Sequence, residues 1–91
     1  MPYYVYMIKT KGGSYSKSYV GYTNDIIQRL KKHNKNKGAK STKGYNWVLI
    51  YKRKFLSKSD AMSYEYKLKK DNKRRKKILS KYIKWLIHWK F

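Results

Sequence analysis

The sequence predicts an α+β domain whose elements follow the order strand, strand, helix, strand, helix, helix. Strands are expected where aromatic and β-branched side chains gather, at residues 3–9, 18–22 and 47–55. Helices are expected where apolar residues recur at helical spacing behind capping side chains. A chain of 91 residues makes one domain with one modest core, and no internal repeat or domain boundary divides it.

The first two strands are predicted to pair as a hairpin. Residues 3–9 alternate between two faces, one carrying Tyr4, Tyr6 and Ile8 and the other Tyr3, Val5 and Met7. A second strand follows at residues 18–22. Gly12 and Gly13 lie between the two strands, which predicts a hairpin with a loop longer than the two-residue type.

A capped helix and a third strand are expected next. Asn24 and Asp25 stand where N-cap residues belong, and the helix behind them is expected to end near Asn34. Residues 35–46 lack periodicity and predict a loop. Residues 47–55 are rich in β-formers and predict the third strand.

Two further helices are predicted in the C-terminal part. Ser57 and Asp60 form a capping-box pattern ahead of a helix over residues 58–70. Residues 71–77 are nearly all charged and are interpreted as a basic linker. A C-terminal helix is expected beyond them, because apolar side chains repeat at helical spacing, at Ile78, Leu79, Tyr82, Ile83 and Leu86.

Charge is the strongest compositional feature. Twenty-five Lys and Arg residues face four acidic residues, which gives a net charge of +21. Self-repulsion of this size disfavours the compact state unless a polyanion neutralises it. Nucleic acid, bound through its phosphate backbone, is the expected partner, and an anionic membrane surface is the next candidate.

Several classes of protein are excluded by what the sequence lacks. It has no cysteine, so neither a disulfide nor a thiolate metal site stabilises it. No basic leader with an apolar run follows Met1, and no run of about eighteen apolar residues could span a bilayer. Residues 38–42 lack the Gly-Lys adjacency of a phosphate loop, which excludes a nucleotide hydrolase. A cytoplasmic protein without membrane insertion is therefore expected.

The four acidic residues differ in how well local structure explains them. Asp25 opens a helix, Asp60 completes a capping box, and Asp71 relieves repulsion among lysines at a helix end. Glu65 instead projects into the apolar face of its helix, among Ala61, Met62 and Leu68. A buried carboxylate needs a cation, so its partner is either a basic side chain or a divalent metal ion. Mg²⁺ fits the second alternative, since it binds through one carboxylate, waters and a substrate phosphate.

Arg29 and His33 form a second candidate pair, because residues four apart share one edge of a helix. They lie on the shoulder of the predicted inward stripe, which consists of Ile26, Ile27, Leu30 and Asn34. A guanidinium group on this shoulder suits bidentate recognition of a phosphate. The alternative for the histidine is an ordinary surface position.

Two tripeptides, Tyr4-Val5-Tyr6 and Tyr19-Val20-Gly21, resemble the pair that names the GIY-YIG nuclease family. Tyr4 replaces the first glycine of the family pattern, and valine replaces isoleucine in both tripeptides. The residues that follow in the family's order are Tyr22-Thr23-Asn24, Arg29 to Asn34, residues 37–42, and Glu65 within residues 64–70. The resemblance covers residues 3–70 and is closest to the small stand-alone bacterial members.

This resemblance implies a three-stranded antiparallel sheet flanked by helices, and hydrolysis of a DNA phosphodiester with one divalent metal ion, Mg²⁺ or Mn²⁺. By position, Tyr6 matches the tyrosine that activates or orients water, and Tyr19 the second active-site tyrosine. Arg29 matches the arginine that steadies the scissile phosphate, His33 a histidine that helps with proton transfer, and Glu65 the metal ligand. A tyrosine hydroxyl group has a pKa of about 10 in water, so the basic surroundings are expected to help it act as a base.

Two departures from the family pattern bear on function. Twelve residues separate Tyr6 from Tyr19, so the hairpin loop is longer than in the most similar small members. The sequence also holds no large DNA-binding module, so we expect little sequence preference, with any selectivity following DNA shape. Phosphate contacts are assigned to five basic residues, Lys37, Lys40, Lys43, Lys69 and Lys70.

Two rival functions fit the composition. A non-catalytic nucleic-acid-binding module needs only basic charge and exposed aromatic side chains. A membrane-surface protein would use residues 78–91, where Tyr82, Trp85 and Trp89 alternate with lysines. Glu65 argues against the binding module, because a carboxylate is unfavourable on a face that meets a polyanion. For residues 78–91, the preferred interpretation is a C-terminal helix packed across the domain.

Overall fold

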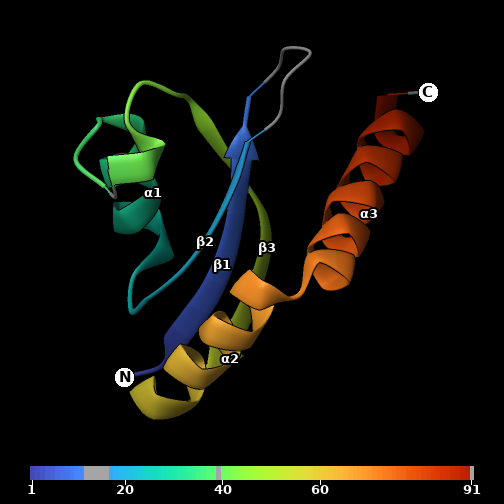
Figure 1. Ribbon diagram of the computed structural model, residues 1–91. Coiled ribbons are helices and arrows are strands. Elements are labelled where there is room, and N and C mark those ends of the chain that lie inside the picture. Colours follow the sequence, from blue (N-terminus) through green and yellow to red (C-terminus); the bar gives the residue numbers. More distant parts are fainter. Residues whose placement is uncertain (12–16, 39, 91) are drawn as a thin grey trace.

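The computed structural model describes residues 1–11, 17–38 and 40–90. Three strands, β1 (Tyr3–Thr10), β2 (Ser18–Thr23) and β3 (Trp47–Phe55), form one antiparallel sheet in the order β2-β1-β3. The helices are α1 (Ile26–Asn34), α2 (Lys58–Lys70) and α3 (Asn72–Lys90), with a 3₁₀ turn η1 (Lys40–Thr42) before β3. Helix α1 covers one face of the sheet, and α2 and α3 lie on the other (Figure 1). The predicted α+β class and element order are confirmed, whereas the predicted turn at Gly12 and Gly13 lies outside the described residues.

The alternation predicted for β1 divides the core between the two faces of the sheet. Val5 and Met7 point toward α2 and α3 and pack with Ala61, Leu68 and Ile78. Tyr6 and Ile8 point toward α1 and pack with Trp47, Tyr19, Leu30 and Leu49. The face that carries Tyr6 is therefore the face that α1 covers.

Each helix begins at a side-chain cap. Asp25 Oδ1 accepts a hydrogen bond from Gln28 N at 3.1 Å, and Ser57 Oγ accepts one from Asp60 N at 3.1 Å. Asp71 Oδ1 accepts one from Arg74 N at 2.9 Å, so Asp71 starts α3. The interpretation of residues 71–77 as a linker is wrong, because this capping bond allows the basic run to form the first turns of a helix.

Strand β3 carries a bulge opposite the middle of β1. Met7 pairs with Tyr51, whereas its neighbour Ile8 pairs with Leu49, so Ile50 is the additional residue. Consecutive side chains of a regular strand point to opposite faces. At this bulge, Ile50 and Tyr51 both pack against the cluster beneath α2 and α3.

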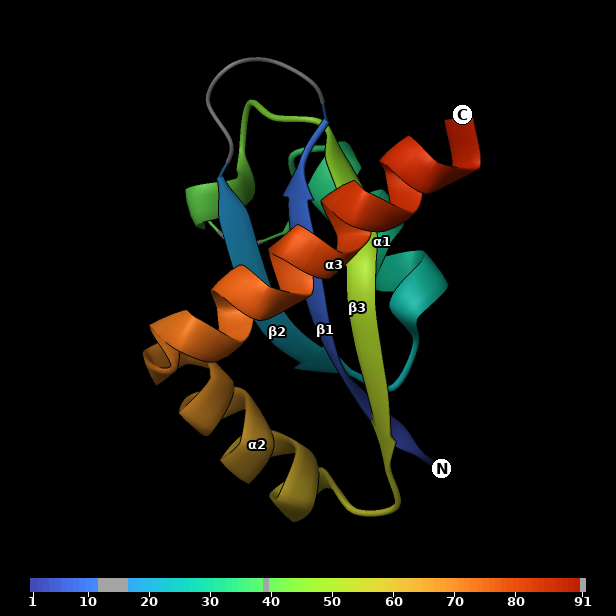
Figure 2. The same ribbon diagram turned by 90° about the vertical axis from the view of Figure 1, so that its right-hand side faces the viewer.

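Helix α3 crosses the sheet obliquely from the end of α2 toward the β3 edge (Figure 2). Ile78, at 7 % exposure, anchors it in the core, which confirms the preferred interpretation of a helix packed across the domain. Among residues 1–11, 17–38 and 40–90, no helix is long and apolar enough to cross a membrane.

Candidate active site

A buried hydrogen-bonded chain runs from the sheet through α1 to η1. Tyr6 Oη lies 2.8 Å from His33 Nε2, and His33 Nδ1 lies 2.9 Å from Thr42 Oγ1. Tyr6 is 3 % exposed, and His33 and Thr42 are fully buried. The alternative of a surface position for His33 is therefore wrong, because both ring nitrogens find polar partners inside the fold.

Burial sets the protonation of this chain. It lowers the pKa of His33 below its usual value, with a further contribution from the charge of Arg29, so the imidazole is neutral at pH 7. A neutral ring has one nitrogen that donates and one that accepts. With its hydrogen on Nδ1, His33 donates to Thr42 Oγ1 and accepts from the Tyr6 hydroxyl group at Nε2; with the hydrogen on Nε2, it donates to Tyr6 Oη and accepts from the Thr42 hydroxyl group.

The hydroxyl group of Tyr6 is less acidic than the basic composition led us to expect. Burial raises its pKa, and the neighbouring Tyr19 and Glu65 raise it further. Only Arg29 acts in the lowering direction. The expectation that the basic surroundings would favour the phenolate is wrong for Tyr6, because desolvation outweighs the one nearby cation.

Two glycines make room for this chain. A Cβ atom at Gly21 would lie 2.5 Å from Tyr6 Oη, and one at Gly38 would lie 2.4 Å from His33 Nδ1. Both positions therefore exclude larger side chains. Gly21 lies directly against the Tyr6 hydroxyl group, and Gly38 brings the segment before β3 against the imidazole ring.

A cleft of about 400 Å³ opens on the other side of Gly21, along the β2 edge of the sheet. We name it the β2-edge cleft. Its lining residues include Tyr19 from β2, Arg29 from α1 and Glu65 from α2. The Tyr19 ring also contacts His33, with ring centroids 5.1 Å apart, and lies 6.4 Å from the Tyr6 ring. Three of the five predicted residues thus line the cleft, and the other two, Tyr6 and His33, lie buried beside it against the Tyr19 ring.

A tight connection brings Arg29 to the cleft. Thr23 Oγ1 accepts a hydrogen bond from Asp25 N at 3.1 Å, which turns the chain directly from β2 into α1. Arg29 then lies on the first turn of the helix, beside the strand that carries Tyr19.

Helix α1 is rotated relative to the predicted stripe. Ile27 is 69 % exposed, whereas His33 is the residue of this helix that is fully buried. Asn34 fixes the rotation, since its Oδ1 accepts from Trp47 N at 2.6 Å and its Nδ2 donates to Trp47 O at 3.2 Å. The prediction that Ile27 faces inward is wrong, because a histidine with two polar partners occupies the interior instead.

Glu65 is largely buried, with 15 % of its side chain exposed, and Oε1 lies 3.3 Å from Lys69 Nζ. The structure therefore describes a basic side chain as its partner, one of the two alternatives that the sequence left open. Ala61 and Leu68 flank it in the core as predicted, but Met62 is 46 % exposed and points elsewhere.

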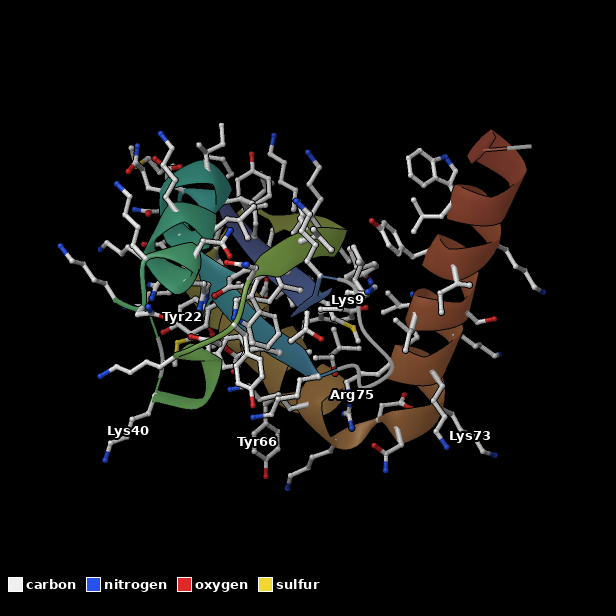
Figure 3. All side chains as sticks on the ribbon, turned by 90° about the horizontal axis from the view of Figure 1, so that it is seen from above. Lys9, Tyr22, Lys40, Tyr66, Lys73 and Arg75 are labelled. Atoms are coloured by element: carbon white, nitrogen blue, oxygen red, sulfur yellow. The ribbon has the colours of Figure 1, made fainter. Side chains whose placement is uncertain are left out.

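The basic residues assigned to phosphate contacts lie on the surface but do not all reach the cleft. Lys37, Lys40 and Lys43 are exposed on the segment before β3, and Lys40 projects outward in Figure 3. Lys70 Nζ donates to Tyr66 Oη at 2.5 Å, away from the cleft. Lys69 lies closest to the predicted site, through Glu65 and through the Tyr19 ring, whose centroid is 5.8 Å from Nζ.

Sequence reasoning did not identify Thr42, Gly38 and Gly21 as part of the site. The predicted loop over residues 35–46, which includes Gly38 and Thr42, is tied to the fold. Trp47 Nε1 donates to Thr42 O at 2.9 Å, and Gly44 N donates to Asn36 Oδ1 at 2.7 Å. The sequence feature that could have indicated this role is a glycine and a threonine, Gly38 and Thr42, placed shortly after His33.

No group of three or more His, Cys, Asp and Glu side chains comes together in the part of the chain that the structure describes. A cation at the β2-edge cleft would therefore have one protein carboxylate, that of Glu65. This donor set suits Mg²⁺, which retains several waters and shares its remaining positions with a phosphate.

The chain is similar to known proteins along most of its length. The sequence model of the family described as GIY-YIG catalytic domain matches residues 2–78. The chain is 42% identical over 80 residues to the UPF0213 protein BH0048 of Halalkalibacterium halodurans, covering 87% of this chain and 82% of that protein. It is 42% identical over 77 residues to the UPF0213 protein YazA of Bacillus subtilis, covering 84% and 75%. A solution NMR structure of the UPF0213 protein BH0048 from Bacillus halodurans superposes with a TM-score of 0.50 at 40% identity, covering 89% of this chain and 84% of that one.

Proposed function

The chain belongs to the GIY-YIG catalytic-domain family, and from this membership we propose that it is an endonuclease that hydrolyses DNA phosphodiester bonds with a divalent metal ion, Mg²⁺ or Mn²⁺. The observation that carries the proposal is the β2-edge cleft, which is lined by a guanidinium group, a tyrosine and a carboxylate. Hydrolysis of a phosphodiester requires neutralisation of the phosphate, an activated water and help for the leaving oxygen. The residues around the cleft supply a candidate for each requirement.

Arg29 is the candidate for the phosphate. Its guanidinium group can donate two parallel hydrogen bonds to phosphate oxygens, and its charge is permanent. The cleft is also bordered by Lys58, so the cationic groups on its walls attract the backbone of DNA.

Glu65 is the candidate metal ligand. Its present partner Lys69 has a side chain that is 48 % exposed, and ion pairs of this kind contribute little to stability. A divalent cation can therefore compete for the carboxylate. When bound, the metal ion would neutralise charge on the phosphate and assist the leaving oxygen.

Tyr6 and His33 are the candidates for proton transfer. A buried phenol with a raised pKa is a poor base by itself. Its hydrogen bond to neutral His33 changes this, because the phenol can pass its proton to Nε2 as its oxygen takes one from water. Thr42 holds the imidazole from the other side, and Tyr19 lies between this chain and the cleft, where it can orient the water.

A non-catalytic nucleic-acid-binding module is the second candidate function. The observation that favours it is the Glu65–Lys69 pair, which satisfies the carboxylate without a metal ion. Such a module would bind DNA without requiring Mg²⁺ and would cut none.

The two candidates are separated by incubating the protein with branched, nicked and linear DNA, with Mg²⁺ and with EDTA. The nuclease proposal expects cleaved strands in Mg²⁺ and intact strands in EDTA. Intact DNA of all three kinds in Mg²⁺ and in Mn²⁺, at protein concentrations that bind it fully, would leave the binding module as the function.

A further inference from the structure

A second concave surface lies at the opposite edge of the sheet, between β3 and α3. This cavity of about 600 Å³, which we name the α3 groove, is separate from the β2-edge cleft. Its aromatic lining residues are Tyr51, Tyr82 and Trp85. Its charged lining residues are Arg74, Lys77 and Lys81, all of them basic.

The bulge in β3 forms one wall of this groove. Because it turns Ile50 and Tyr51 to the same face, two side chains rather than one stand at the edge beneath α3. The hydroxyl group of Tyr51 lies 2.8 Å from that of Tyr64, and Arg74 lies beside both tyrosines. This wall is therefore fixed by contacts within the fold.

Helix α3 forms the other wall. Ile78 anchors the helix in the core, and one turn later Tyr82 and Trp85 stack, with ring centroids 6.0 Å apart and ring planes at 30°. Trp85 is 56 % exposed although it lines the groove. Lys77 and Lys81 lie on the same side of the helix, one turn apart.

We propose that the α3 groove binds an unpaired nucleic-acid strand, with bases stacked on its aromatic side chains and phosphates held by its three cations. Charge complementarity favours this occupant, because aromatic faces interleaved with Lys and Arg, without an acidic group, match bases interleaved with phosphates. A flat bilayer surface would not enter a groove walled on both sides. A second copy of this chain would bring the same positive charge against it.

The inference rests on the proposed function in one respect, since it names the class of DNA that would be cut. The β2-edge cleft and the α3 groove lie at opposite edges of one three-stranded sheet. A substrate with one phosphate in the cleft and an unpaired strand in the groove carries a single-stranded branch beside the position of cleavage. Branched and flapped DNA have this form, and continuous duplex does not.

The test is binding of a fluorescein-labelled oligo(dT) of about 12 nucleotides, within the range of one strand-binding groove, measured by anisotropy in EDTA. Trp85→Ala is expected to weaken binding by about 10-fold, since stacking contributes that much per base. Tyr66→Ala is the control, because Tyr66 is 59 % exposed on α2 and points outward (Figure 3). Circular dichroism checks that both variants are folded.

Charge is tested with matched pairs on α3. Lys77→Gln with Lys81→Gln removes two charges from the groove, whereas Lys76→Gln with Lys84→Gln removes two exposed charges outside its lining. The first pair should weaken oligo(dT) binding several-fold more than the second. Equal losses for the two pairs, or unchanged binding of Trp85→Ala, overturn the proposal. The proposal is also overturned if Trp85→Ala leaves oligo(dT) binding unchanged but abolishes binding to anionic vesicles or dimerisation of the protein.

Cleavage of branched DNA and of plain duplex in Mg²⁺, measured on the same variants, separates the two proposals. If the wild type binds oligo(dT) through Trp85 but cuts no DNA, the nuclease proposal fails and the groove stands. If the wild type and all variants cut duplex at the same rate, and neither Trp85→Ala nor the pair Lys77→Gln with Lys81→Gln changes oligo(dT) binding, the groove proposal fails. The nuclease proposal then stands.

Discussion

The buried tyrosine is the least expected feature of the site. Tyr6 is 3 % exposed and its pKa is raised, yet its oxygen lies behind Gly21 at the cleft. Its partner His33 is neutral because burial lowers its pKa. Proton transfer from Tyr6 to His33 leaves a buried imidazolium, which is costly in a dry place, so the transfer must be coupled to passage of a proton from water to the Tyr6 oxygen. The pair is thus suited to transient proton transfer and unsuited to storing a phenolate.

The first prediction concerns the chemical step. Tyr6→Phe and Arg29→Ala should each lower the single-turnover rate by about 10²–10³, the usual loss when a group that stabilises developing charge is removed. Tyr66→Phe and Lys32→Ala, on exposed positions of α2 and α1, are the controls and should cut normally. Near-normal rates for both active-site variants, folded by circular dichroism, would rule out the assigned roles.

The second prediction concerns pH. The pKa of His33 lies below its ordinary value of 6.5 in the folded protein. As pH falls from 6.5 toward the folded pKa, the unfolded chain takes up a proton at this residue and the folded chain does not, so stability decreases. Nitrogen chemical shifts of the His33 ring should still report a neutral imidazole at pH 6.5. The urea concentration at the midpoint of unfolding should decrease as the pH is lowered below 6.5. A ring that is half protonated above pH 6.5 would contradict the assignment.

The sequence named five candidate side chains but not the residues that hold them. Tyr19, Arg29 and Glu65 line one cleft, and Tyr6 and His33 lie buried beside it, whereas their catalytic roles stay predictions. Thr42 could not be foreseen, because its role depends on η1 folding back over α1, a contact that no local pattern specifies. The raised pKa of Tyr6 could not be predicted either, because desolvation depends on packing between elements.

Among the helices and strands, α3 begins in the sequence that is least favourable for a helix start. Its first turns carry a run of basic side chains that repel one another and the lysines in the last turn of α2. Asp71 offsets this through its hydrogen bond to Arg74 N, and Arg75 donates to Leu68 O at 2.7 Å at the end of α2. These contacts set the angle at which α3 leaves α2 and crosses the sheet.

The third prediction tests this cap. Asp71→Ala should lower the free energy of unfolding by about 0.5–2 kcal/mol, the usual cost of losing an N-cap. Asp71→Ser, which keeps an accepting oxygen, should retain most of the stability. Urea unfolding followed by circular dichroism provides the measurement. Equal stability of wild type and Asp71→Ala would show that the charge run forms helix without the cap.

Element boundaries were predicted well where a cap or a β-rich run marks them, as at α2 and β3. The start of α3 was missed because charge composition was given more weight than Asp71, whose side chain is a standard cap. The β3 bulge could not be predicted either, because register is set by pairing with β1 and leaves no mark in the strand itself.

For the whole molecule, a net charge of +21 surrounds a site with one largely buried carboxylate. Such a field attracts DNA of any sequence and concentrates it near the surface. The β2-edge cleft and the α3 groove lie at opposite edges of the same sheet, so the fold offers two places of different chemistry to one polyanion.

The fourth prediction is that affinity for duplex DNA comes mainly from phosphate contacts. Binding should weaken steeply with salt, with a log–log slope of about −0.9 per phosphate neutralised. Removing one contacting cation, with Lys69→Gln as the first candidate, should reduce the slope by about one unit. A competition assay that finds a preference of about 10³-fold for one linear sequence would contradict this, because that ratio belongs to specific binders.

We propose that Glu65 holds the metal ion on which DNA cleavage depends, and the substitution Glu65→Gln is the decisive experiment. The substitution keeps the size of the side chain and removes the charge that would hold the metal ion. In Mg²⁺, wild-type protein should cut DNA, whereas Glu65→Gln should bind it as tightly or more tightly and leave it uncut. The loss of Mn²⁺ binding, followed by the electron paramagnetic resonance of free Mn²⁺, should accompany the loss of cutting. Cleavage of DNA by Glu65→Gln at the wild-type rate would show that Glu65 is not the metal ligand on which cutting depends.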